Sequence, residues 1–426
     1  MILVMVLFVL LLIAGAPIVF TMGISASLVL MGEEIPMSII SQRLFAGLDS
    51  FTIMAIPFFV LSGLLMERGG IARRMIDFAT ALVGWIRGSL LLVSVVSGTG
   101  LAAVSGSGSA DTAATASLML PEMRRRCYDI DFAAGLMAAA GSLGPVIPPS
   151  IMMIVLASVG NVSVGDMFIA GVVPGFLMAL GLLLAGYFHA RRYGGVYSQV
   201  QPFSLKELGA TALRAIPAFL MPIIIIGGIV GGVFTPTEAA SVAVATGLLV
   251  GLFIYKELKF RDLPRLILRA ASISASVMMI IAVANIFSWL VAREGVPQLL
   301  VGFLQSLSDN PWVFLALLNV GLIFVGMFME SIAAILILVP VLMPVAQSYG
   351  IDPLHLGVVI IINLSIGMIT PPYGITLFVA SSIAQRPIMR VAGKIILPLS
   401  FMLAVLLLVT YVPSVVTALP DFFRTR

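Results

Sequence analysis

This sequence has very little charge for its length. Charged residues make up 10% of its 426 residues and hydrophobic residues 61%, whereas soluble domains carry about 25% charged residues. The mean hydropathy is +1.18. These values exclude a soluble globule and predict an all-α polytopic membrane protein, because helices satisfy their own backbone hydrogen bonds in lipid.

Ligand and nucleotide motifs are equally scarce. The single cysteine, Cys127, excludes an internal disulfide. The two histidines, His189 and His355, lie in different halves of the chain, so a histidine and cysteine metal site is not expected. No Gly-x-x-x-x-Gly-Lys-Ser/Thr motif is present. We therefore expect neither an enzyme nor direct use of ATP, and an ion gradient remains as the common energy source.

No Lys or Arg precedes the N-terminal apolar run, so we expect a retained span over residues 2–22 and not a cleaved signal. We expect spans at 49–66, 215–233 and 270–291, a polar connection at 205–214 and amphipathic interfacial segments at 67–85 and 256–269.

Two apolar stretches are interrupted by the same proline pattern. Gly144-Pro-Val-Ile-Pro-Pro-Ser150 and Gly367-Met-Ile-Thr-Pro-Pro-Tyr-Gly374 share a Gly-x-x-x-Pro-Pro layout, 223 positions apart. Proline removes a backbone donor and clashes with the preceding turn, so each helix must break there. Unpaired carbonyls are tolerated at membrane depth only in a protein interior or polar cavity. Paired broken helices therefore predict a transporter's binding site.

Each break is preceded by a predicted helical hairpin. The first, at 88–122, turns at Ser105-Gly-Ser-Gly-Ser109, and the second, at 312–345, turns near 326–331. The arms of the first are shorter than the roughly 20 residues of a spanning helix, which indicates a re-entrant loop. We expect the second hairpin to be re-entrant as well. A flexible linker between two spans is the alternative. Asp131 aligns with Asp352 and Pro174 with Pro398, which indicates one unit used twice.

The basic residues fall unevenly on this layout. Of the 23 Lys and Arg residues, 19 lie on one side, and only Arg43, Arg293, Arg424 and Arg426 lie on the other. The crowded side is cytoplasmic by the positive-inside rule, so the two repeats are predicted to be inverted. We expect scaffold spans at 1–66 and 201–292, and transport units at 67–200 and 293–426, with the broken helices at 131–160 and 354–384.

Uncharged oxygen groups at the tips and breaks suit a hard cation such as Na⁺. Na⁺ ligands are expected chiefly among backbone oxygens. The candidates are Ser105, Ser107, Gly144, Ile147 and Pro149 in the first half, and Gly326, Gly367, Thr370 and Pro372 in the second. Ser109, Asp111 and Thr112 are secondary candidates. The alternative is that these small residues only permit close helix packing.

Two ionisable residues near the second unit are candidates for substrate binding. Arg293 can clamp a carboxylate through its planar fork, or form a surface pair with Glu294. Glu330 can pair with Arg293, bind a substrate hydroxyl or amine, or set the charge of the site. Ser107 and Ser150 are the remaining candidates, beside backbone donors after Pro149 and Pro372.

Four motifs together resemble the large membrane subunit of tripartite ATP-independent periplasmic (TRAP) transporters. They are Ser105-Gly-Ser-Gly-Ser-Ala-Asp-Thr112, the Gly144–Ser150 break, Phe234-Thr-Pro-Thr-Glu-Ala-Ala240 and Thr370-Pro-Pro-Tyr-Gly374. The resemblance covers essentially the whole chain. It implies an elevator-type secondary transporter of the bacterial inner membrane that imports organic acids, such as sialic acid or C4-dicarboxylates, with Na⁺.

The same resemblance implies two partners, a small four-helix membrane subunit and a periplasmic substrate-binding protein. Because the chain starts directly at the large-subunit span, we expect the small subunit to be a separate polypeptide. Two alternatives remain: a stand-alone Na⁺/dicarboxylate carrier and an ion channel with re-entrant loops. Hairpins that open to opposite sides suit alternating access better than a continuous pore.

Overall fold

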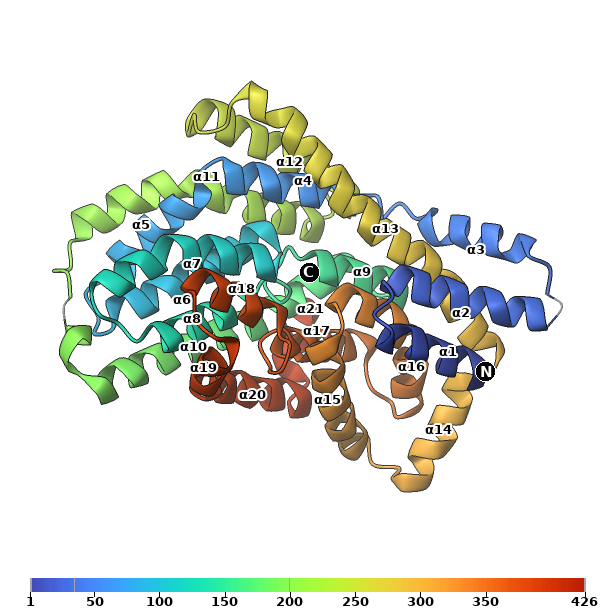
Figure 1. The fold of residues 1–426 in the computed structure, drawn as a ribbon. Helices are drawn as coiled ribbons and strands as arrows, with labels where there is room; N and C mark the ends of the chain where they lie inside the picture. The colour runs from blue at the N-terminus through green and yellow to red at the C-terminus, as the bar shows by residue number, and fades with distance from the viewer. Residues whose placement is uncertain (1, 34, 199, 425–426) are drawn as a thin grey trace.

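The computed structural model describes residues 2–33, 35–198 and 200–424, and every regular element in these ranges is helical (Figure 1). Arg426, which the charge argument counted on the sparse side, lies outside the described residues. Two helix pairs are bent at a short break: α4 (Ala55–Arg68) with α5 (Ile71–Val83) by 65°, and α19 (Ile388–Lys394) with α20 (Ile396–Tyr411) by 57°. Six described segments are long and apolar enough to cross a bilayer: Val164–Tyr193, Leu205–Val230, Pro236–Ile254, Phe260–Arg293, Pro311–Phe328 and Ser331–Ser348.

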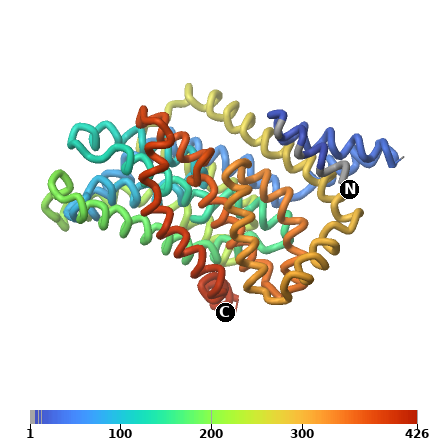
Figure 2. The backbone as a smooth tube through the Cα atoms, turned by 60° about the horizontal axis from the view of Figure 1, so that its bottom comes forward, coloured from blue at the N-terminus to red at the C-terminus, as the bar shows by residue number. Residues whose placement is uncertain are grey.

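The N-terminal part consists of four helices. The expected span at 2–22 is wrong, because the first helix ends at Ile13, Gly15 follows with φ +80°, and the next helix begins after Pro17. Proline cannot supply the donor that a continuous helix would need. Figure 2 shows these blue helices beside the yellow to gold helix α13 (Leu263–Arg293). The four are α1 (Ile2–Ile13), α2 (Ile18–Gly32), α3 (Ser38–Leu48) and α4 (Ala55–Arg68).

The first repeat contains one hairpin and one broken helix, as the sequence predicts. The hairpin turns over two residues, with Gly106 at φ +60°, a conformation that glycine adopts without a steric penalty. The helix breaks between Gly141 and Ile151. The elements are α5 (Ile71–Val83), α6 (Ser89–Ser105), α7 (Gly108–Arg125), α8 (Ile130–Gly141), α9 (Ile151–Gly160), α10 (Val164–Tyr193) and the 3₁₀ turn η1 (Gly195–Ser198).

The middle of the chain is more continuous than predicted. Residues 205–214 are not a polar connection but the first turns of α11, where Ser204 Oγ accepts from Glu207 N at 3.3 Å. The basic segment at 256–269 likewise runs into α13. The elements are α11 (Leu205–Val230), α12 (Pro236–Leu249), the π-helical turn η2 (Val250–Ile254), the 3₁₀ turn η3 (Phe260–Asp262) and α13 (Leu263–Arg293).

The second repeat follows the same order, with a break between Gly367 and Ile375. Each break contains one cis proline bond, Pro148–Pro149 in the first and Pro371–Pro372 in the second. The elements are α14 (Val296–Leu307), α15 (Pro311–Phe328), α16 (Ser331–Ser348), α17 (Pro353–Gly367), α18 (Ile375–Ala384), α19 (Ile388–Lys394), α20 (Ile396–Tyr411) and α21 (Ser414–Arg424).

The predicted match of Asp131 with Asp352 is wrong by two residues. Asp129 caps α8 by accepting from Asp131 N and Phe132 N at 3.1 and 3.2 Å. Asp352 caps α17 by accepting from Leu354 N and His355 N at 2.7 and 3.0 Å. Aspartate at this position satisfies donors that the first turn leaves free. Asp129 is therefore the counterpart of Asp352, with the same spacing of 223 as Gly144 and Gly367.

The repeats exchange helices as they pack. The first arm of each hairpin packs on the helix before its own break, α6 on α8 and α15 on α17. The second arm of each packs on the helix after the other break, so α7 packs on α18 and α16 on α9. Neither repeat can therefore bury its hairpin without the other.

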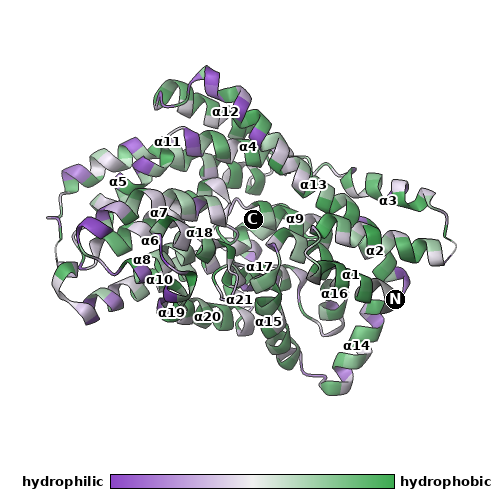
Figure 3. Ribbon diagram, viewed as in Figure 1, coloured by the Kyte–Doolittle hydropathy of each residue, from purple (hydrophilic) through white to green (hydrophobic). Residues whose placement is uncertain are grey.

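Three polar side chains inside the second repeat form a chain of hydrogen bonds. Asn363 Nδ2 donates to Asn319 Oδ1 at 2.8 Å, and Asn319 Nδ2 donates to Thr410 Oγ1 at 3.0 Å, which joins α15, α17 and α20. Elsewhere the helix bodies are mainly apolar and polar residues gather near helix ends and loops (Figure 3). Many large apolar side chains are exposed, as expected for helices that face lipid.

Candidate functional site

The tip of the first hairpin lies directly on the first break. A methyl group added to Gly144 would lie 2.9 Å from Gly108 N and 3.1 Å from the Ser107 carbonyl carbon. One added to Gly106 would lie 2.9 Å from Pro149 O and 3.2 Å from Ser150 Cα. Such distances allow no side chain, so these glycines permit backbone-to-backbone contact. The structure thus brings together Ser107, Gly144, Pro149 and Ser150, as predicted from the sequence.

A buried carboxylate faces this contact. Ser105 Oγ donates to Asp111 Oδ1 at 2.5 Å and accepts from Ser107 N at 3.0 Å, which fixes the tip. Asp111 Oδ2 is buried, receives no hydrogen bond from the described residues, and would lie 3.0 Å from a methyl group on Gly144. A buried carboxylate oxygen without a partner is costly. A cation held by the tip and break would remove that cost.

The second hairpin meets the second break in the same way. A methyl group on Gly367 would lie 2.6 Å from both Gly326 Cα and the Gly326 carbonyl carbon. Thr370 Oγ1 donates to Ile366 O at 2.7 Å, so its hydroxyl oxygen stays beside the break. Thr376, which the sequence did not single out, closes the break through Oγ1 to Met368 O at 2.9 Å. Pro372 follows its cis bond in the unwound segment.

The Ile147 side chain packs the first break against α10. A methyl group on Gly175 of that helix would lie 2.9 Å from Ile147 Cγ1. Only the Ile147 backbone oxygen is therefore suited to an ion, as expected from the sequence.

The two breaks also touch each other. Ser365 Oγ on α17 donates to Ser142 O, at the start of the first break. A methyl group on Gly108 would lie 2.9 Å from Met368 Cε and 3.4 Å from Thr376 Cγ2. Ser142 and Ser365 are counterparts at the spacing of 223, so the repeats meet at equivalent positions.

Two cavities open beside the tips. One of about 310 Å³ is lined by the tip residues Ser105, Ser107 and Ser109 together with α4 and α13. The other, of about 590 Å³, lies between the second tip and α18 and is lined by Glu330, Tyr373 and Phe378. Val379 lines both. Their volumes fall at or near the range of roughly 300 to 1,000 Å³ usual for small-molecule sites.

Charged residues missed at the sequence level line the smaller cavity. Arg269 of α13 and Glu67 of α4 both face it. Within the part of the chain that the structure describes, Arg269 has no ion pair. Arg269 was counted only as part of a basic cluster, because nothing local distinguishes it from its neighbours. It is the cation best placed to meet an anion at the first tip.

Arg293 lies at the opposite end of α13. A rise of 1.5 Å per residue separates it from Arg269 by about 36 Å along the helix. Its Nη1 pairs with Glu33 Oε2 at 2.8 Å, at the C-terminal end of α2, and its guanidinium lies 5.8 Å from the centre of the Trp289 ring. Glu330 instead caps α16, where Oε2 accepts from Ala333 N at 3.0 Å. The predicted alternative in which Glu330 pairs with Arg293 is therefore wrong, because each side chain has another partner.

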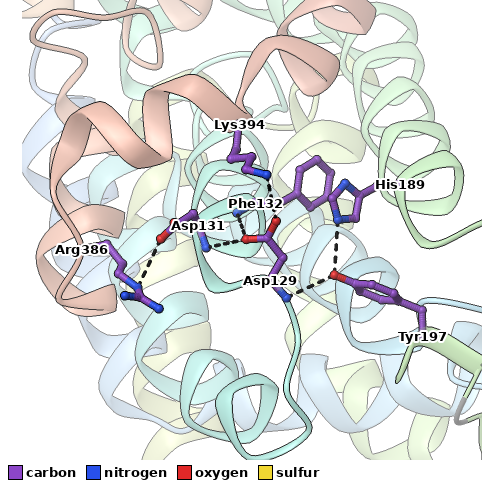
Figure 4. A network of polar contacts seen from close by, with 7 residues as sticks. All are labelled: Asp129, Asp131, Phe132, His189, Tyr197, Arg386 and Lys394. Atoms are coloured by element: carbon purple, nitrogen blue, oxygen red, sulfur yellow. Dashed lines mark hydrogen bonds and ion pairs between the residues drawn. The ribbon is translucent and has the colours of Figure 1, made fainter. Parts of the chain in front are cut away.

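A polar network ties the repeats together at the start of α8 (Figure 4). Lys394 Nζ lies 3.4 Å from Asp129 Oδ2, and Arg386 Nε lies 3.2 Å from Asp131 Oδ1. Asp129 N donates to the Tyr197 hydroxyl at 3.1 Å. Burial raises the pKa of Tyr197, so the phenol keeps its proton. These contacts attach the segment after α18 to the first repeat.

Comparisons with known proteins identify the family. Residues 4–415 match the family described as "Tripartite ATP-independent periplasmic transporter, DctM component". The chain belongs to this family. It is 39% identical over 426 residues to the C4-dicarboxylate TRAP transporter large permease protein DctM of Rhodobacter capsulatus, covering 96% of each chain. It is 38% identical over 414 residues to the sialic acid TRAP transporter large permease protein SiaM of Vibrio cholerae, covering 97% of this chain and 96% of that one.

A solved structure has a similar fold. The crystal structure of the Alcanivorax borkumensis YdaH transporter aligns with a TM-score of 0.60 at 15% identity, over 87% of this chain and 86% of that one. Membership of the DctM family confirms the predicted resemblance and makes the chain a membrane TRAP transporter large permease subunit, not an enzyme.

Proposed function

We propose that this DctM-family permease imports organic acids together with Na⁺ by an elevator mechanism across the bacterial inner membrane. The observation that carries the proposal is the seating of each hairpin tip on its own break. Unwound backbone, serine hydroxyls and the Asp111 carboxylate there supply oxygen ligands without a paired cation. An organic acid is supported by the relatives, which are named for C4-dicarboxylates and sialic acid.

The moving body would contain both repeats, with the units 67–200 and 293–426 inverted relative to each other. The exchange of α7 and α16 between repeats supports movement as one body, and the Asp129–Lys394 and Asp131–Arg386 pairs add to it. The helices at 1–66 and 201–292 would form the scaffold. We propose a small four-helix membrane subunit and a periplasmic binding protein as partners.

A stand-alone Na⁺/dicarboxylate carrier that needs no binding protein is the second candidate, because the C4-dicarboxylate relative supports the substrate class whether or not partners are required. Uptake by the purified chain in vesicles, with and without its small subunit and binding protein, distinguishes the two. Unitary currents in a planar bilayer would indicate the third alternative, an ion channel.

We predict that uptake requires Na⁺, because the tip and break groups are suited to a hard, monovalent cation. The measurement is uptake of labelled succinate and of sialic acid into proteoliposomes, under imposed Na⁺ or H⁺ gradients and with the membrane voltage controlled. Purified protein should also unfold at a higher temperature in NaCl than in choline chloride, because a bound ion stabilises only the folded state. Equal uptake and equal unfolding temperatures without Na⁺ would contradict the proposal.

Arg293 remains our proposed anchor for the substrate anion on the side with few basic residues. Arg293→Ala and Arg293→Lys should each lower uptake by about tenfold to a hundredfold, because a charge-assisted contact contributes roughly 1.5 to 3 kcal/mol and lysine lacks the planar fork. Glu33→Gln is the matched control, since it removes the partner at 2.8 Å and keeps the arginine. If Glu33→Gln and Arg293→Ala lower uptake equally, the arginine acts only through the ion pair.

A further inference from the structure

A third cavity, of about 320 Å³, lies beside the first break. It is enclosed by α5, α6, α10 and α11, and Ile147 and Pro148 of the break form part of its wall. It therefore touches the segment that carries predicted Na⁺ ligands without including any group proposed to bind substrate.

Water is a poor occupant of this cavity. Its only side-chain hydroxyl belongs to Thr99, and Thr99 Oγ1 already donates to Val95 O at 2.8 Å. A buried water needs two to four polar partners. An empty space of this size would leave the surrounding side chains without contacts on one side. An apolar occupant would give the apolar side chains that line the cavity their missing contacts.

The cavity opens toward lipid. Phe176 of α10 and Ile223 of α11 both line it, and they are 67% and 63% exposed. Both helices are long and apolar enough to cross a bilayer, so side chains exposed on their bodies meet hydrocarbon. Met75, on the amphipathic helix α5, closes another side with an adaptable side chain.

We propose that this cavity binds one acyl chain of a membrane phospholipid. The chain enters between Phe176 and Ile223 and contacts Ile147 and Pro148 of the first break. Each buried methylene gains apolar contact there, while the headgroup stays at the membrane surface. The site lies between α11, in the proposed scaffold, and α6 and α10, in the proposed moving body. A flexible acyl chain fills the space between the two bodies and still lets them move relative to each other.

Tryptophan fluorescence in lipid of known composition tests the proposal. The full chain is prepared with Trp85, Trp289 and Trp312 replaced by phenylalanine, and Phe219→Trp places one reporter in the cavity wall. It is reconstituted in phosphatidylethanolamine and phosphatidylglycerol whose acyl chains carry bromine at mid-chain, and in the unbrominated lipids. Phe188→Trp, at an exposed position of α10 outside the cavity, is the matched reporter for ordinary surrounding lipid.

The expected result is strong quenching at position 219 by brominated lipid that is lost when Ala103→Phe fills the cavity, with quenching at position 188 unchanged. Thr99→Leu is the second filling variant, in case Ala103→Phe does not fold. Absence of quenching at position 219 overturns the proposal, since it means a dry cavity or a covering protein partner. Quenching that survives both filling variants also overturns it, because it reports only lipid at the outer surface.

Discussion

Replacing Gly367 by valine is expected to reduce uptake at least about 100-fold, because the larger side chain should destabilise the active arrangement by roughly 3 kcal/mol. The cause is backbone contact. A Cβ at this position would lie 2.6 Å from two backbone atoms of Gly326, so neither a rotamer change nor a flexible side chain can relieve the overlap. The second tip would be pushed off the second break, and any ion site between them would be lost.

Gly321→Val is the matched control, because Gly321 lies on α15, the hairpin arm that carries Gly326, and a Cβ there meets no atom within 4 Å. Both variants should be compared by proteoliposome uptake at equal membrane expression and by thermal unfolding with and without Na⁺. The argument fails if Gly367→Val transports like Gly321→Val. Loss of the Na⁺-dependent rise in unfolding temperature in Gly367→Val alone would place the defect at the ion site.

Asp111→Asn is expected to raise the Na⁺ concentration for half-maximal uptake by about tenfold to a hundredfold, or roughly 1.4 to 3 kcal/mol. The variant keeps the shape of the side chain and removes its charge. Asp111 Oδ2 is buried beside Gly144 and the first tip and receives no hydrogen bond from the residues described, so a cation there would be its closest opposite charge. Even at an effective dielectric constant of about 20, such a pair at 4 Å is worth about 4 kcal/mol.

Asp166→Asn provides the control, since Asp166 pairs with Arg424 away from the tips. Uptake is measured across a Na⁺ series at two pH values. An unchanged Na⁺ requirement in Asp111→Asn would remove the carboxylate from the ion site. A changed pH dependence with an unchanged Na⁺ requirement would assign it to proton movement instead.

Local features of the chain were largely predictable. Three prolines at 145–149 and two at 371–372 forbid a continuous helix wherever they fall, and the structure breaks at both. A Ser/Gly run between apolar arms turns at Gly106 for a similarly local reason, because glycine accepts φ +60°. The predicted span at 2–22 was wrong because the high hydropathy of the segment favoured one continuous helix, whereas Gly15 and Pro17 interrupt it. Membership of the DctM family was predictable because four motifs in order specify it.

The sequence by itself therefore determined the membrane class, the two breaks, the two hairpin tips and the family, since each depends on neighbouring residues. Only the tertiary structure decided which distant groups meet. Ser365 reaches Ser142, Arg269 faces the first tip, and Arg293 pairs with Glu33, 260 positions away. These contacts depend on how each helix is rotated and how far it is shifted along its neighbours. Packing of the whole bundle sets both quantities, and no local pattern records them.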